Sequence, residues 1–187
     1  DTDLTTLDLV TTEQPNSGGR DFIRGDNGGD LIFGGTDADT IYGDDGDLEA
    51  DATGGDDLLL GDHGRIYPHY SALADFNSRN FFAIDTGDAD GGEGDRIWGE
   101  EGDDTLMGQQ GDDLMWGGGG DDDMTGGHNV SGGYDELGAP AINITLNPAV
   151  NDLMDGGLGD DAMAGDNAII WRRGDDLSPR FRELTEA

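Results

Sequence analysis

Large aliphatic residues recur every nine positions in three stretches of the chain, at about residues 16–67, 90–128 and 151–167. Written in nines, the first stretch contains GDNGGDLIF and GGTDADTIY, and the second contains GEEGDDTLM and GQQGDDLMW. The shared pattern is G-G-x-G-x-D-x-U-x, in which U is a large aliphatic residue. Position eight of this repeat holds Ile23, Ile32, Ile41, Leu59, Ile97, Leu106, Met115, Met124, Met154 and Met163.

The spacing predicts a coil made of short strands and tight turns. Glycines at positions one, two and four permit the positive φ of a tight turn, and they let the backbone of one turn approach the next. Positions five to nine then form a strand in which position eight points inward and positions seven and nine point outward. One repeat makes half a coil, so strands 18 residues apart stack about 4.8 Å from each other in a parallel sheet.

A carboxylate at position six accompanies the aliphatic residue in almost every repeat. These residues are Asp21, Asp30, Asp39, Asp57, Asp95, Asp104, Asp113, Asp122, Asp152 and Asp161. Stacked coils bring these carboxylates into register with the carbonyl oxygens of the glycine-rich turns. Six to eight hard oxygen ligands suit Ca²⁺, whereas Mg²⁺ holds its waters and requires a tighter octahedron.

Composition explains why such a coil would need the ion. The chain has 187 residues, 35 of them Gly, and its 43 acidic groups against nine basic ones give a net charge of −34. A core one residue deep does not offset the ordering of so many Gly and Asp residues. Eight Ca²⁺ would reduce the charge to about −18, and each site at ten times its dissociation constant would add about 1.4 kcal/mol. We therefore expect an expanded chain without calcium. A flexible Gly/Asp spacer is the alternative, but it would not keep an aliphatic residue at one position.

The repeat resembles the RTX nonapeptide repeat of secreted bacterial toxins, proteases, lipases and adhesins. The resemblance implies an all-β fold, a right-handed parallel β-roll in which Ca²⁺ ions lie in rows between turns. It also implies turn carbonyl ligands at position four, which here is Gly28, Gly102, Gly111, Gly120 and Gly159. We expect one domain over residues 1–187.

The repeat at 43–51 departs from the pattern, because Leu48 stands at position six and Ala50 at position eight. Its length of nine keeps the phase. Either a degenerate half-coil runs through this segment or a loop of the same length leaves the roll. In both cases the calcium site that a carboxylate at position 48 would complete is lost or altered, although neighbouring aspartates such as Asp44 could substitute.

Two insertions of about 22 residues follow, at 68–89 and 129–150. Loops of this length are usually functional or have structure of their own. Trp98 and Trp116 are 18 residues apart at position nine, so we expect them to stack on the outer face of one sheet. An exposed aromatic face normally binds something. We expect one insertion to cover this face, and the alternative is a glycan or protein platform.

The ends of the repeat blocks differ from the repeats themselves. GDHGRIY at 61–67 and GDNAIIW at 165–171 resemble each other, and each is expected to close its block with an ordinary strand. The segment 168–187 contains four of the nine arginines and is expected to cap the open edge of the roll.

Several functions are disfavoured by composition. With no Cys, disulfides, thiolate metal sites and cysteine nucleophiles are excluded. The negative charge argues against nucleic acid as a partner, because phosphate groups would be repelled. No apolar run is long enough for a membrane span. The opening DTDLTTLDLV lacks a signal-peptide pattern, as expected of an excised or processed segment. His63, His69 and His128 show no zinc spacing and are expected to be turn or surface residues. No G-x-S-x-G motif is present, so catalysis is not expected.

These observations predict a non-catalytic calcium-binding module of a secreted or cell-surface bacterial protein, exported through a type I channel and folding on extracellular Ca²⁺. The alternatives are an adhesion or scaffold module that contacts a glycan or protein, an accessory module of an enzyme, and an ice-binding roll. Position three reads Asn27, Thr36, Asp45, Gly54, Glu101, Gln110, Gly119 and Leu158, which is no ice-binding ladder.

Overall fold

The computed structural model of the chain describes residues 10–14, 16–46, 54–68, 81–86, 92–128, 151–168 and 170, and every regular element among them is a β-strand. The strands are β1 (Val10–Thr11), β2 (Phe22–Arg24), β3 (Leu31–Phe33), β4 (Thr40–Tyr42), β5 (Leu58–Leu60), β6 (Arg65–Pro68), β7 (Phe81–Asp85), β8 (Arg96–Glu101), β9 (Thr105–Met107), β10 (Leu114–Gly119), β11 (Asp123–Thr125), β12 (Leu153–Leu158) and β13 (Ala162–Ala164). The all-β prediction is confirmed.

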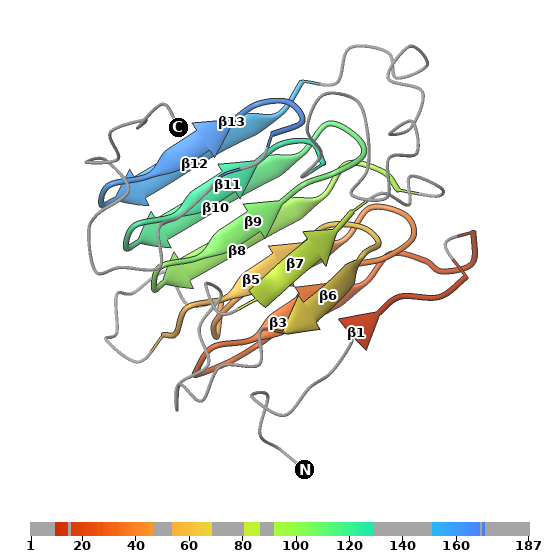
Figure 1. Cartoon of the computed structure of the whole chain (residues 1–187), viewed down its shortest axis with the longest axis horizontal. Helices are drawn as coiled ribbons and strands as arrows, with labels where there is room; N and C mark the ends of the chain where they lie inside the picture. Colours follow the sequence, from red (N-terminus) through yellow and green to blue (C-terminus); the bar gives the residue numbers. More distant parts are fainter. Residues whose placement is uncertain are drawn as a thin grey trace.

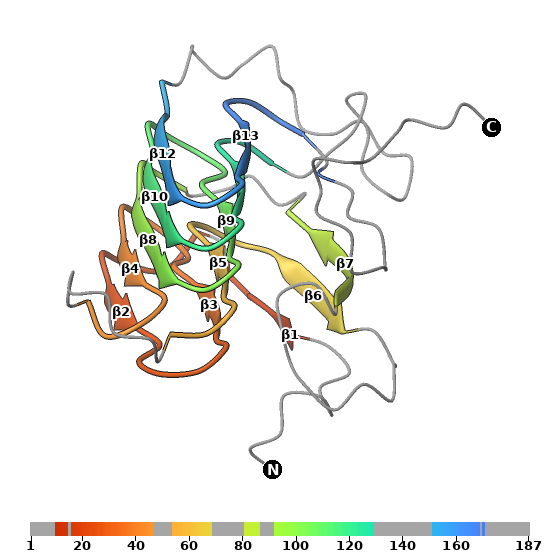
Figure 2. The ribbon, with the colours of Figure 1, turned by 90° about the vertical axis from the view of Figure 1, so that its left-hand side faces the viewer.

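Ten of the strands form two parallel sheets that face each other (Figure 1, Figure 2). The first sheet has the order β12-β10-β8-β4-β2, and the second has the order β13-β11-β9-β5-β3. The chain passes from one sheet to the other at each turn, as a roll of half-coils requires. Neighbouring strands pair in register, so that Met115 lies opposite Ile97 in the first sheet and Met124 opposite Leu106 in the second.

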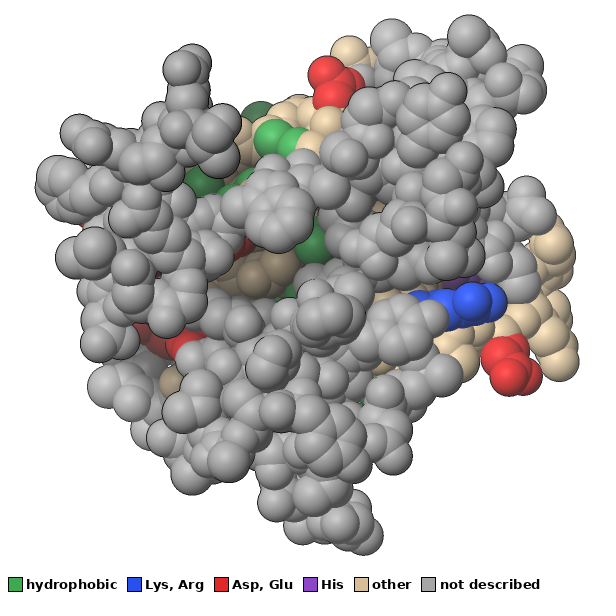
Figure 3. All heavy atoms as spheres, in the orientation of Figure 1, with side chains coloured by type: hydrophobic (Ala, Val, Ile, Leu, Met, Phe, Trp, Pro, Cys, Tyr) green, Lys and Arg blue, Asp and Glu red, His purple; other side chains and the backbone are tan. Residues whose placement is uncertain are grey.

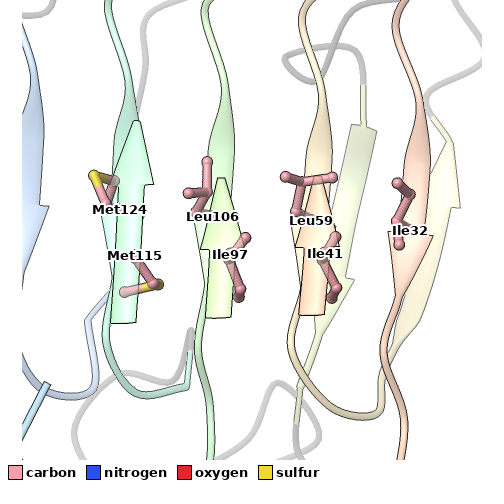
Figure 4. Packing of buried hydrophobic residues seen from close by; sticks show 7 residues of the cluster. All are labelled: Ile32, Ile41, Leu59, Ile97, Leu106, Met115 and Met124. Carbon is pink, nitrogen blue, oxygen red and sulfur yellow. The ribbon is translucent and has the colours of Figure 1, made fainter. Parts of the chain in front are cut away.

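The core is a single layer of position-eight side chains between the two sheets (Figure 4). Seven of them form one buried cluster: Ile32, Ile41, Leu59, Ile97, Leu106, Met115 and Met124. Ile23 and Met154 pack at its two ends. At the last coil Met163 is 50% exposed, because no further described strand follows it. The predicted core, one residue deep, is therefore confirmed.

The irregular repeat at 43–51 does not form a half-coil. β3 pairs directly with β5, and the backbone N–H of Asp30 bonds to a residue 27 positions later instead of 18. The nine additional residues fall between Tyr42 and Leu58, and residues 47–53 of this stretch, including Leu48, lie outside the described part. Of the two alternatives, the loop is correct.

A third, antiparallel sheet has the order β1-β6-β7 and lies beside the second sheet (Figure 2). β6 closes the first repeat block as an ordinary strand, as expected, and β7 comes from the first insertion. Ile66 of β6 packs with Leu58, Leu60 and Met107, which project from the outer face of the second sheet. The expectation that an insertion covers the tryptophan face is thus wrong for β7, which lies over the opposite sheet.

Other predicted segments fall outside the described residues. These are the second insertion at 129–150, most of the first insertion, and nearly all of the proposed cap at 168–187. In the described part of the chain, no helix is long and apolar enough to cross a membrane.

Candidate metal centres

The ten position-six aspartates form two continuous ladders, one along each parallel sheet. In each ladder the backbone N–H of one aspartate donates to Oδ1 of the aspartate in the next coil, at 2.7–3.1 Å. The first ladder is Asp21, Asp39, Asp95, Asp113 and Asp152, and the second is Asp30, Asp57, Asp104, Asp122 and Asp161. The sequence separations of these bonds range from 18 to 56 residues, so the ladders continue across every interruption of the repeat.

In six of these aspartates the second carboxylate oxygen is left without a hydrogen bond within the described part of the chain. The Oδ2 atoms of Asp30, Asp39, Asp57, Asp95, Asp104 and Asp113 are buried and have no hydrogen-bond partner among the described residues. A buried carboxylate oxygen in that state costs free energy unless something else satisfies it. The ladders are therefore incomplete without a positive group.

The unpaired oxygens face the glycines at position one of each turn. A Cβ at Gly99 would fall against Oδ2 of Asp104 and the carbonyl oxygen of Gly117 in the next coil, and the equivalent holds at Gly108 with Asp113 and Gly126. Carboxylate and carbonyl oxygens thus converge where only glycine leaves room. Position-one glycines among the described residues do not adopt positive φ, so the expectation of a special backbone conformation was wrong there, and the close approach explains the glycine.

Burial raises the pKa of the ladder carboxyls. Desolvation is the largest cause throughout, and repulsion from other acids adds to it, whereas backbone hydrogen bonds to the carboxylates lower the pKa. It raises the pKa of Asp104 to about 9, of Asp57 and Asp95 to about 8, and of Asp113 to about 7. Nearer the N-terminal end the pKa values of Asp30 and Asp39 rise to about 6. The carboxylate form is thus disfavoured in the middle of the ladders, and a bound cation would favour it.

The donor set fits a hard, oxygen-seeking cation. No group of three or more His, Asp or Glu side chains in the described ranges comes close enough to hold a metal ion alone. Each site would therefore combine carboxylates with backbone carbonyls, which is the ligand set that Ca²⁺ accepts. A few acidic side chains reach the face shown in Figure 3, whereas the middle members of the ladders are buried.

Comparison with protein-family models places two segments of the roll in a known class. Residues 16–47 and 98–127 match the RTX calcium-binding nonapeptide repeat, in four copies. These segments are RTX calcium-binding repeats. The suspected resemblance is confirmed, and the repeats imply Ca²⁺ as the ion. No match was found among curated proteins or among solved structures.

The five position-four glycines proposed as carbonyl ligands, Gly28, Gly102, Gly111, Gly120 and Gly159, all have positive φ, whereas Gly19 and Gly55 at the same repeat position do not. Gly120 has a φ of 142°, and a Cβ on it would fall against the carbonyl oxygen of Gly102 in the preceding coil. Gly159 lies in the same way against Gly120, and Gly111 lies against Gly94 in the opposite row of turns. Gly28 forms an isolated bridge with Gly54. All five glycines lie in the turns of the roll, although the structure does not test their carbonyls as ligands.

Two of the three histidines are inside the RTX turns and not on the surface as the alternative expectation had it. His63 is buried, and its Nε2 lies 3.1 Å from Oγ1 of Thr36. His128 is buried, its Nδ1 lies 2.5 Å from the carbonyl oxygen of Thr86, and desolvation lowers its pKa. His128 thus ties the end of β7 to the roll. His69 lies outside the described residues.

The aromatic side chains at position nine form a stack along the first sheet. The rings of Trp98 and Trp116 have centroids 4.7 Å apart and planes 8° apart, and Tyr42 stacks on the other face of Trp98 at 4.6 Å. The predicted stacking is confirmed. Because both faces of Trp98 are used by its neighbours, a sugar could not stack on that ring.

The sequence analysis missed a further ladder at position five. Backbone N–H groups of Asp103, Asp121 and Asp160 donate to Oδ1 of Asp56, Asp103 and Asp121 respectively, at 2.8–2.9 Å. Aspartates at position five also recur in the sequence, so their spacing of one coil could have indicated this row.

Proposed function

We propose that this chain is a non-catalytic calcium-binding module whose roll is completed by Ca²⁺ ions between its coils. The row of buried Oδ2 atoms without hydrogen bonds supports the proposal most directly. The ligands would be the ten position-six carboxylates together with turn carbonyls, among them those of the position-four glycines. Neutralising these carboxylates would remove both the desolvation penalty and much of the self-repulsion of a chain with a charge of −34.

Calcium binding and folding would then be one process. The unfolded chain presents no preformed site, so the free energy of binding contributes to folding. Because the position-eight layer is one residue deep, the metal-free roll would be much less stable than the calcium-bound roll. The proposed roll is right-handed, because connections between parallel strands of one sheet strongly prefer that hand.

We further propose that the module belongs to a secreted or cell-surface bacterial protein. A chain that folds only when it meets millimolar calcium would remain extended in a low-calcium cytosol and would pass through a type I channel before folding outside. The RTX repeats support this by family resemblance, since such repeats are typical of secreted bacterial proteins. The alternative, an adhesion module that binds a glycan on the tryptophan row, has less support, because neighbouring rings occupy both faces of Trp98.

The test is calorimetric titration of the chain with Ca²⁺ and, separately, with Mg²⁺, while far-ultraviolet circular dichroism follows β content. We expect several Ca²⁺ sites, much weaker Mg²⁺ binding, and β content that appears with calcium occupancy. The same β spectrum in calcium-free and calcium-saturated buffer would refute coupled folding. Equal affinity for the two ions would refute the proposed ligand set.

A further inference from the structure

The first insertion leaves the roll and returns to it at one turn, which we call the neck. The outgoing segment is 61–64, after β5, and the returning segment is 92–95, before β8. In the next coil the equivalent turn is the continuous segment 108–113 between β9 and β10. The neck is thus one turn of the roll assembled from two parts of the chain.

A buried carboxylate that the repeat pattern does not require lies across the neck. Asp62 stands at position two, where the consensus has glycine, and it is 0% exposed. Its carboxylate lies against Gly92 of the returning segment, where a Cβ would collide with it. Oδ2 accepts the backbone N–H of Gln110 at 2.8 Å, and Oδ1 has no hydrogen-bond partner among the described residues.

A second unpaired oxygen comes from the returning segment. Oδ2 of Asp95 lies against Gly61, the residue before Asp62, and the carbonyl oxygen of Gly108 lies against the same glycine. The carboxylates of Asp62 and Asp95 are close enough to repel each other. Two buried acids and a carbonyl oxygen therefore lie in the one turn where the insertion begins and ends.

We propose that Asp62 and Asp95 together bind one divalent cation of the calcium type at the neck, so that the ion ties the outgoing segment to the returning one. This deepens the proposed function and rests on it. Both carboxylates and the carbonyl of Gly108 are hard oxygen ligands. The repeat itself supplies only Asp95, so Asp62 is the feature that makes this site particular to the insertion.

The same arrangement recurs in the opposite row of turns, in the described residues on either side of 47–53. Asp44, also at position two, is buried, and its carboxylate lies against Gly54 of the returning segment. Its Oδ2 accepts the N–H of Glu101 at 3.1 Å, and its Oδ1 has no hydrogen-bond partner in the described ranges. By contrast, Asp26 stands at position two of a continuous turn and is exposed. Buried acids at position two thus accompany these two departures from the roll.

The neck site predicts two effects of Asp62→Asn in the full chain, with Asp26→Asn as the matched control. Asparagine keeps an acceptor for the N–H of Gln110 but removes the charge. Calcium titration should show one site weakened at least about tenfold, because charge count sets affinity in such sites. Hydrogen exchange at saturating calcium should become faster in β6 and β7, which the neck positions, and remain unchanged in β10 and β11. Asp26→Asn should match the wild type in both measurements.

A calcium isotherm of Asp62→Asn that superimposes on that of the wild type would overturn the neck site while leaving the proposed function intact. A wild-type chain that binds no calcium would overturn both. If Asp62→Asn does not reach the wild-type circular dichroism spectrum in excess calcium, Asp62→Gly is the second variant to measure, because it restores the consensus residue of the repeat. The same weakening of one site is expected from it, and unchanged binding would again refute the proposal.

Discussion

The aliphatic ladder at position eight and the carboxylate ladders at position six lie two residues apart in the same coils, yet they differ in what they leave unsatisfied. Leu59, Leu106 and Met124 contact one another in a closed layer that needs no ligand. Asp57 and Asp104 are equally buried, but each has one oxygen with no hydrogen bond in the described structure. Burial thus stabilises the first ladder and penalises the second.

On the proposed function, this difference is the source of the roll's dependence on a cation. A roll of this width could bury its aliphatic residues with any polar residue at position six, but this chain has buried acids there. A bound cation would offset the cost of burying them. The largest consequences should therefore appear when the charge on the carboxylate ladders is changed without touching the aliphatic layer.

Acidification of the calcium-free chain is expected to have the largest effect. The folded pKa values of Asp57 and Asp95, about 8, and of Asp104, about 9, lie well above the value of about 4 for an unfolded chain. For a carboxyl with a raised folded pKa, the stabilising contribution is present below the unfolded pKa and is lost as the pH rises through the folded pKa. Without calcium, the roll should therefore gain stability as the pH falls from about 9 toward 5.

In buffers stripped of calcium by resin, the β content by circular dichroism would check this at each pH, with urea titrations at those pH values where the calcium-free chain is folded. Asp104→Asn should flatten the dependence, because asparagine does not titrate, and this separates the ladder from general charge reduction. With calcium present the direction should reverse, since the ligands must be deprotonated to bind. A midpoint that rises with pH in the calcium-free chain would contradict the raised pKa values.

Truncation within the aliphatic ladder should have the next largest effect. Leu106 is 0% exposed in the middle of the layer, so Leu106→Ala should cost about 2–5 kcal/mol of unfolding free energy at saturating calcium. Met163 ends the same row and is 50% exposed, so Met163→Ala should cost about 1 kcal/mol or less. Equal losses in denaturant titrations would mean that the layer extends beyond β13.

The ladder positions were predictable from the sequence because the repeat encodes them locally. A period of nine with Asp at position six and an aliphatic residue at position eight identifies both rows, and pairs such as Ile97 with Met115 confirm the register. What the period could not indicate is how the coils join across the breaks. The bond from Asp39 to Asp95 spans 56 residues, and a repeat pattern says nothing about which coil follows an insertion.

The parts outside the repeat were not predictable for a related reason. β1, β6 and β7 pair with one another and lack the repeat pattern, so only long-range contacts such as those of Ile66 decide which face they cover. The special position of Asp62 was not predictable for the same reason. In the sequence it is one more acid in a turn, and only the return of Gly92 to its carboxylate distinguishes it from Asp26.

The smallest expected effect, and the sharpest test of the comparison, comes from single charges in one carboxylate ladder. Asp104→Asn keeps an acceptor for the N–H of Asp57 but removes one ligand charge from the middle of the row. At ten times the dissociation constant, loss of one site would cost about 1.4 kcal/mol. In calcium-free buffer at neutral pH the same change should stabilise the roll, because Asp104 with its pKa raised to about 9 must take up a proton when it is buried, whereas asparagine does not.

Asp161→Asn is the control, because Asp161 lies in the last coil, is partly exposed, and ends the same ladder. Its effect should be smaller in calcium and near zero without it. Paired denaturant titrations of both variants, with and without calcium, measure all four values. A ladder completed by cations requires the two conditions to give opposite signs at Asp104, whereas an ordinary buried hydrogen-bond acceptor would change stability by the same amount in both.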